Sequence, residues 1–110
     1  MTTRSSKFWA HGSSTAESVV VFECPAGTAS LLKSIYGYTQ GTTGDTNVLV
    51  YAGLAPAIII INDPPIAAIR IIKWDGWIVL EPGDYVVVTN SSGGTVQTWG
   101  SGALLPLGST

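Results

Sequence analysis

The sequence predicts an all-β fold: an antiparallel β-sandwich or jelly roll of about eight strands, with an arm at each end. No segment of 11 or more residues places apolar side chains at helical spacing without an intervening Gly or Pro. Short runs of β-branched and aromatic residues follow one another instead, each bounded by Gly, Pro, Asn, Asp or Ser. Because no helical crossover separates these runs, neighbouring strands are expected to pair antiparallel.

The elements follow from these runs in chain order. Residues 1–17 are rich in Ser and Thr and are expected to form an N-terminal arm, residues 18–105 the sandwich, and residues 106–110 a C-terminal tail. The expected strands are Ser18–Glu23, Ala29–Tyr38, Val48–Gly53, Ala57–Ile61, Ala67–Trp74, Trp77–Leu80, Asp84–Thr89 and Val96–Leu104.

Three turns carry specific chemistry. Asp75-Gly76 lies between Trp74 and Trp77 and predicts a two-residue hairpin, because both central residues of a type I′ turn need positive φ. Pro25-Ala26-Gly27 and Pro82-Gly83-Asp84 predict corners, since Pro presets φ and Gly accepts the left-handed conformation.

Charge and length exclude several functional classes. A chain of 110 residues forms one domain, and only 11% of its residues are charged, with a net charge of -2. Nucleic-acid binding is not expected, because the few basic residues are scattered along the chain. A membrane span is not expected either, since the longest apolar run, Leu54–Ile61, is interrupted by Pro56 and is far shorter than about 20 residues.

The N-terminal residues contain no apolar stretch of the length that a secretory signal needs. We therefore expect the protein to be made and assembled in a cytoplasm. The single cysteine, Cys24, cannot form a disulfide within the chain and does not constrain the redox compartment further.

Several strands are apolar on both faces, which predicts self-association. One face of each packs in the sandwich, and the other needs a cover that a chain without helices does not provide. The expected partner is a second copy, in a trimer or ring; the alternative is that loops and arms fold back over the outer faces. The candidate interface residues are Phe8, Trp9, Ile58, Ile60, Ile69 and Ile71.

The sequence offers little chemistry for catalysis, so we expect no enzyme, no cofactor and no metal. The one histidine, His11, lies in the expected arm, where no rigid scaffold supports a base. With Cys24 it makes only two nitrogen or sulfur ligands, fewer than a zinc site requires. Glu81 and Asp84 flank a Pro-Gly corner and are explained as turn residues.

Aromatic residues suggest an alternative function. Trp74, Trp77 and Trp99 could serve as stacking platforms for sugars, as in a carbohydrate-binding module that recognises receptor or host-surface glycans. The opposing interpretation is packing, with Trp74 and Trp77 as a cross-strand pair worth about 0.2–1 kcal/mol. We favour packing, because few polar side chains that could bind sugar hydroxyls surround these residues in the sequence.

Two motifs resemble a known group of proteins. Residues 20–35, Val-Val-Phe-Glu-Cys-Pro-Ala-Gly-Thr-Ala-Ser-Leu-Leu-Lys-Ser-Ile, form a strand, a corner and a second strand. Residues 77–84, Trp-Ile-Val-Leu-Glu-Pro-Gly-Asp, lead into a Val-rich strand. Together they resemble small β-sandwich virion structural proteins of tailed bacteriophages, over about residues 18–105.

The resemblance implies a non-enzymatic building block, either a head decoration protein or a minor tail protein. Its partners would be further copies and other virion proteins, such as the major capsid or tail proteins, and its location the virion. The resemblance transfers no binding residues, because the group has no catalytic motif. The break at Asn62-Asp63-Pro64-Pro65 and the long leader depart from the pattern.

Overall fold

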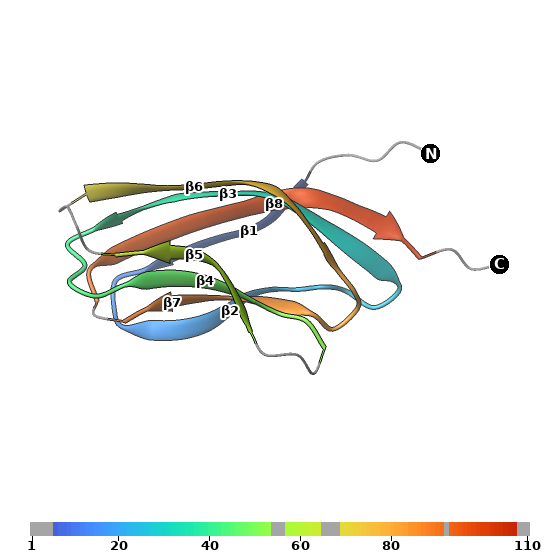
Figure 1. Ribbon diagram of the computed structural model, residues 1–110, viewed down its shortest axis with the longest axis horizontal. Coiled ribbons are helices and arrows are strands. Elements are labelled where there is room, and N and C mark those ends of the chain that lie inside the picture. Colours follow the sequence, from blue (N-terminus) through green and yellow to red (C-terminus); the bar gives the residue numbers. More distant parts are fainter. Residues whose placement is uncertain (1–5, 54–56, 65–68, 92, 108–110) are drawn as a thin grey trace.

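The computed structural model describes residues 6–53, 57–64, 69–91 and 93–107. It contains eight strands in two four-stranded antiparallel sheets, so the predicted all-β sandwich is confirmed (Figure 1). The strands are β1 (Ser6–Ser13), β2 (Glu17–Glu23), β3 (Thr28–Gln40), β4 (Thr46–Tyr51), β5 (Ile58–Asp63), β6 (Ile69–Leu80), β7 (Tyr85–Asn90) and β8 (Thr95–Pro106).

The strand order is that of a jelly roll. The first sheet has the order β1-β8-β3-β6 and the second the order β2-β7-β4-β5, with every pair antiparallel. Among these strands only β4 and β5 are both consecutive in the chain and paired, so most connections cross between the sheets. The sandwich is elongated, with extents of 51 × 29 × 19 Å.

The core lies between the two sheets and is formed by the inward positions of both. Side chains exposed by 2% or less include Leu32, Ile35, Ile72 and Leu80 of the first sheet and Val48, Val50 and Val86 of the second. Complete burial of one such aliphatic side chain stabilises the fold by about 1.5–3 kcal/mol. The alternation of apolar residues along the strands thus supplies the main driving force for folding.

The N-terminal segment corrects one prediction. Residues 6–13, expected within an arm over residues 1–17, form β1 and pair with β8 at the edge of the first sheet. Trp9 is 6% exposed, and its indole Nε1 donates a hydrogen bond to Thr98 Oγ1 at 3.0 Å. Phe8 stacks on Phe22 with ring centroids 4.5 Å apart. These two aromatic residues hold β1 against the sandwich. The Ser- and Thr-rich composition on which the arm prediction rested does not show this.

The predicted hairpin at Asp75-Gly76 is wrong. β6 runs without interruption from Ile69 to Leu80, and neither Asp75 nor Gly76 has a positive φ. The local signal instead marks a β-bulge, where Gly76 and Trp77 lie opposite the single residue Lys33 of β3. The long β3 provides a partner for the whole of β6, and this pairing overrides the turn preference. Trp74 and Trp77 therefore belong to one strand and form no cross-strand pair.

The two Pro-Gly corners are confirmed. Gly27 and Gly83 have φ values of 78° and 89°. The backbone N–H of Asp84 donates to Glu81 O at 3.0 Å, and that of Thr28 to Pro25 O at 3.3 Å. Both corners carry the chain from one sheet to the other, between β2 and β3 and between β6 and β7.

The ends of the predicted sandwich also change. β8 extends to Pro106, and the backbone N–H of Leu107 donates to Gly27 O at 2.9 Å, so the first two residues of the expected C-terminal tail contact the sandwich. Residues 1–5 and 108–110 of the expected arm and tail lie outside the described residues, as do Ala67 and Ala68 of an expected strand.

Candidate functional site

The exposed side of the first sheet, here called the outer face, carries the candidate site. Cross-strand pairing sets Trp99 of β8 beside Tyr36 of β3, with Lys73 of β6 on the far side of Tyr36. The next row pairs Gln97, Tyr38 and Ile71. Aromatic, aliphatic and polar side chains from three strands therefore share one surface.

A hydrogen bond ties two strands together on this face. The Tyr36 hydroxyl donates to Asp75 Oδ1 at 2.8 Å. The hydrogen bond to the Asp75 carboxylate is the main cause that raises the pKa of Tyr36 above 10.0. Asp75, predicted as a turn residue, instead holds an aromatic ring in place on the sheet.

The free edge of the outer face is strongly apolar. Along β6 the odd-numbered positions point outward, and Ile69, Ile71, Trp77 and Val79 are each more than half exposed. Ile71 and Trp77 are the most exposed, at 75% and 73%. Side chains of this size are usually scattered singly on a monomer surface, so two pairs of them on one strand, separated by Lys73 and Asp75, are unusual.

The predicted interface residues do not all lie on the surface. Ile69 and Ile71 of β6 and Ile58 of β5 are exposed, whereas Ile60 is half-buried and packs against the core. Trp9 is buried in the core and Phe8 is half-buried against it, so neither side chain presents the exposed surface that the interface prediction assumes. A neighbouring exposed residue, Ile59, escaped the prediction because a bulge in β5 shifts the alternation.

Strand β7 is apolar on both faces, and the chain itself covers its outward face. Val86, Val87 and Val88 are all at most 6% exposed. Because β7 lies inside the second sheet, Val20 of β2 and Leu49 of β4 flank Val87 on its outward face. Neighbouring strands of the same chain thus cover this face.

The three predicted sugar-binding tryptophans lie in different places. Trp74 points inward, is half-buried and packs against the core, whereas Trp77 is exposed on β6. Trp99 is 39% exposed on β8, so β3 separates it from Trp77. The three residues share no common platform.

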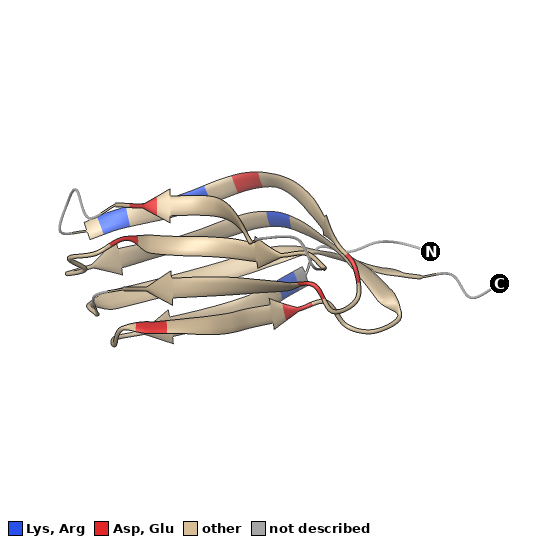
Figure 2. Cartoon of the chain, turned by 60° about the horizontal axis from the view of Figure 1, so that its bottom comes forward, with Lys and Arg blue, Asp and Glu red and all other residues tan. Residues whose placement is uncertain are grey.

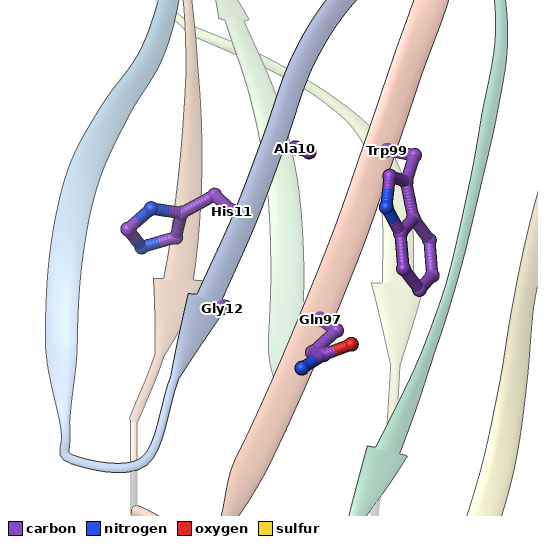
Figure 3. A pocket seen from close by; sticks show the side chains of 5 residues that line it. All are labelled: Ala10, His11, Gly12, Gln97 and Trp99. Atoms are coloured by element: carbon purple, nitrogen blue, oxygen red, sulfur yellow. The ribbon is translucent and has the colours of Figure 1, made fainter.

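A shallow cavity of about 180 Å³ lies beside Trp99 (Figure 3). Its lining comprises Ala10, His11 and Gly12 of β1 with Gln97 and Trp99 of β8. Figure 3 shows the Trp99 indole and the Gln97 amide together on β8, while the His11 imidazole projects away from them. The small residues Ala10 and Gly12 leave the ring and the amide accessible from the side of β1.

His11 has a different partner. Its Nε2 lies 2.9 Å from Glu17 Oε1, which joins β1 to the start of β2. The hydrogen bond to His11 is the largest cause of the lowered pKa of Glu17, and a hydrogen bond to Ser13 lowers it further. The pair is a third exposed and closes the turn between the two strands.

Cys24 is buried and surrounded by hydrogen-bonding groups. It is 1% exposed, and Ser30 Oγ donates to its sulfur at 3.0 Å. The thiol lies 3.4 Å from the carbonyl oxygens of Thr28 and Leu80. Cys24 therefore packs as a small core residue between β2, β3 and β6.

Charged groups are sparse on the strands (Figure 2). No cluster of three or more His, Cys, Asp or Glu residues that could hold a metal occurs within the described ranges. The described part of the chain also holds no helix with the length and hydropathy of a membrane span.

Among the comparisons with known proteins, one solved structure supports the fold. No protein-family model and no curated protein matches the chain. A solved structure of Bacillus endospore appendages, described as a family of disulfide-linked pili, matches with a TM-score of 0.50 and 11% identity, covering 97% of this chain and 90% of that one. A structure of infectious bursal disease virus, Gx strain, matches with a TM-score of 0.46 and 14% identity over 99% of this chain.

The chain spans only 33% of the viral chain. At this level of identity the likeness concerns the fold. The described residues form an eight-stranded antiparallel β-sandwich with the jelly-roll strand order, and the endospore-appendage structure is similar to it in overall fold.

Proposed function

We propose that the chain is a non-enzymatic structural subunit that self-associates and stabilises a larger assembly. The observation that carries this proposal is the exposed aliphatic surface of the two edge strands β5 and β6. Ile58, Ile59, Ile69 and Ile71 are between 57% and 75% exposed there.

The physical reason is the hydrophobic effect. Burying apolar surface contributes roughly 25 cal/mol per Å², so a contact that covers these side chains is favourable. The chain has few charges to keep this surface solvated, since only 11% of its residues are charged. A second copy is the simplest partner, because each copy brings the same surface; a trimer or ring would bring several together.

The setting that we propose is a tailed-phage particle, with the chain as a head decoration or minor tail protein. The resemblance of residues 20–35 and 77–84 to virion β-sandwich proteins supports this setting. The major capsid or tail proteins would then be further partners, and the protein would be located in the virion. The pili described for the matched appendages provide a precedent for a sandwich of this architecture in a polymer.

Sedimentation velocity of the purified chain at micromolar concentration tests this function. We expect oligomers that Ile69→Thr and Ile71→Thr weaken, because both remove exposed apolar surface. Val20→Thr is the matched control, since Val20 is 52% exposed on the edge strand β2 of the other sheet. A wild-type chain that is a monodisperse monomer would overturn the proposal.

The cavity beside Trp99 favours glycan binding as a second candidate function. An exposed indole suits the apolar face of a pyranose, and the Gln97 amide can both donate to and accept from sugar hydroxyls. Of the predicted tryptophans, only Trp99 has this arrangement. A glycan array tests it: Trp99→Ala should abolish any signal, and Trp77→Ala, which removes an equally aromatic but distant side chain, should not.

A further inference from the structure

β6 is an unpaired edge with unusual length. It has twelve residues, against eight in β1, seven in β2 and six in β5, the other edge strands. β3 pairs with one side of β6, and no strand of the described residues pairs with its other side. A long free edge presents backbone N–H and C=O groups that a further strand can complete.

The outward side chains of β6 form a pattern with internal symmetry. In chain order they are Ile69, Ile71, Lys73, Asp75, Trp77 and Val79, and each is exposed. Two apolar residues precede the basic residue, and two apolar residues follow the acidic one. The centre of this pattern is Trp74.

This symmetry matches the pattern to itself when two copies of β6 run antiparallel. With Trp74 of each copy at the centre, Lys73 lies opposite Asp75 of the second copy, and the reverse pair forms by symmetry. The odd-numbered positions of β6 stay outward past the bulge at Gly76, so Ile71 then lies opposite Trp77, and Ile69 opposite Val79. Opposite charges and apolar pairs at facing positions each stabilise a sheet.

Other registers lose this match. A shift of one residue would place outward side chains opposite inward ones. A shift of two residues would place Lys73 opposite Lys73 of the other copy, or Asp75 opposite Asp75, and like charges at facing positions are destabilising. The central register alone gives both ion pairs, so the sequence of β6 specifies one arrangement.

We propose that β6 pairs antiparallel with β6 of a second copy, about a two-fold axis at Trp74, and joins the two first sheets into one eight-stranded sheet. This inference rests on the proposed self-association and names its contact. A two-fold contact is self-complementary, as the Lys73 and Asp75 pairs require. Main-chain hydrogen bonds supply affinity, and the outward side chains supply the register.

Charge reversal tests the contact. Lys73→Glu places acidic residues opposite each other in both symmetric pairs, and Asp75→Lys places basic residues opposite each other. Each single variant should raise the dimer dissociation constant about tenfold at low ionic strength, because two pairs turn from attractive to repulsive. Lys7→Glu, an exposed charge reversal on β1, is the matched control and should leave the constant unchanged.

Mixing the two single variants provides the decisive measurement. In a heterodimer of a Lys73→Glu chain with an Asp75→Lys chain, the introduced glutamate lies opposite the introduced lysine. The native Asp75 of the first chain lies opposite the native Lys73 of the second, so the heterodimer should form as tightly as the wild-type dimer.

The double variant Lys73→Glu/Asp75→Lys should also self-associate normally. Native mass spectrometry of the mixture counts the two homodimers and the heterodimer, and the heterodimer also shows that both variants are folded.

The outcomes separate the two proposals. A wild-type oligomer that neither single variant weakens would overturn the β6 contact and leave self-association intact. Weakened single variants with no preference for the heterodimer would also overturn it. A wild-type chain that stays monomeric would overturn both proposals.

Discussion

The Arg70 guanidinium donates from Nε to Asp63 Oδ2 at 2.8 Å, between the start of β6 and the end of β5. Their side chains are only 6% and 17% exposed. The same guanidinium donates to Thr42 Oγ1 at 2.7 Å, and Thr39 Oγ1 donates to Asp63 Oδ2 at 3.4 Å. This buried cluster fastens the edge strands β5 and β6 to the loop that follows β3.

Replacing Arg70 should destabilise the fold strongly. Arg70→Ala leaves the mostly buried Asp63 carboxylate without its ion-pair partner, and breaking such a pair costs about 3–5 kcal/mol. Chemical denaturation should show this loss as a lower midpoint with an unchanged slope. The double variant Arg70→Met/Asp63→Asn removes both charges and should recover much of the loss; equal stability of the two variants would contradict the role of the pair.

Gly100 makes room for the Trp9 ring. A Cβ at Gly100 would overlap the six-membered ring of Trp9, and Trp9 has no free space because it is 6% exposed. Gly100→Ala should therefore cost about 1–3 kcal/mol through overpacking. Gly12→Ala is the matched control on β1, where the added carbon would approach only Gln97 at 3.4 Å. Thermal unfolding of both variants measures the difference, and equal melting temperatures would refute it.

The His11–Glu17 contact should make stability depend on pH. The hydrogen bond to His11 is the main cause that lowers the pKa of Glu17 from 4.5 in the folded state. A carboxylate whose folded pKa is depressed stabilises the fold above its unfolded pKa, and this stabilisation is lost as the pH falls through the folded pKa.

We therefore expect the wild-type chain to exceed Glu17→Gln in stability at neutral pH, with the difference shrinking below about pH 4.5 and gone once the pH is below the lowered folded pKa. Urea unfolding of both proteins at a series of pH values measures it. A difference that persists unchanged at acidic pH would show that Glu17 acts through packing and not through its charge.

Cys24 should be unreactive in the folded chain. Its sulfur is buried beside Ser30 and Leu80, so a thiol reagent can reach it only when β2 separates from its neighbours. Native protein should react with Ellman's reagent far more slowly than urea-unfolded protein. Rapid reaction in native buffer would contradict the burial.

The predicted number of strands is correct through two errors that cancel. The sequence pattern divides β6 at Asp75-Gly76 and so adds one strand, and it assigns residues 6–13 to an arm and so omits β1. Both errors have a tertiary cause. β3 is long enough to pair with β6 beyond the turn-like dipeptide, and β8 provides an edge for β1.

Residue type also fails to separate core from surface among the aromatic residues. Trp9 and Trp74 pack inward, whereas Trp77 and Trp99 point outward. The direction follows from the alternation along each strand, which depends on how the strand is paired. A composition rich in tryptophan therefore predicts apolar contacts without showing which side of a sheet they occupy.

The sequence by itself determined the fold class and both Pro-Gly corners, because strand periodicity, low charge and the φ preferences of Pro and Gly are local properties. Only the tertiary structure decided which strands are edges, which side chains face outward and that His11 meets Glu17. Those outcomes depend on the pairing of strands far apart in the chain, such as β1 with β8. The symmetric order of Ile, Lys, Asp and Trp in β6 is visible in the sequence. It points to pairing with a second copy only because the structure places β6 at an open edge of its sheet.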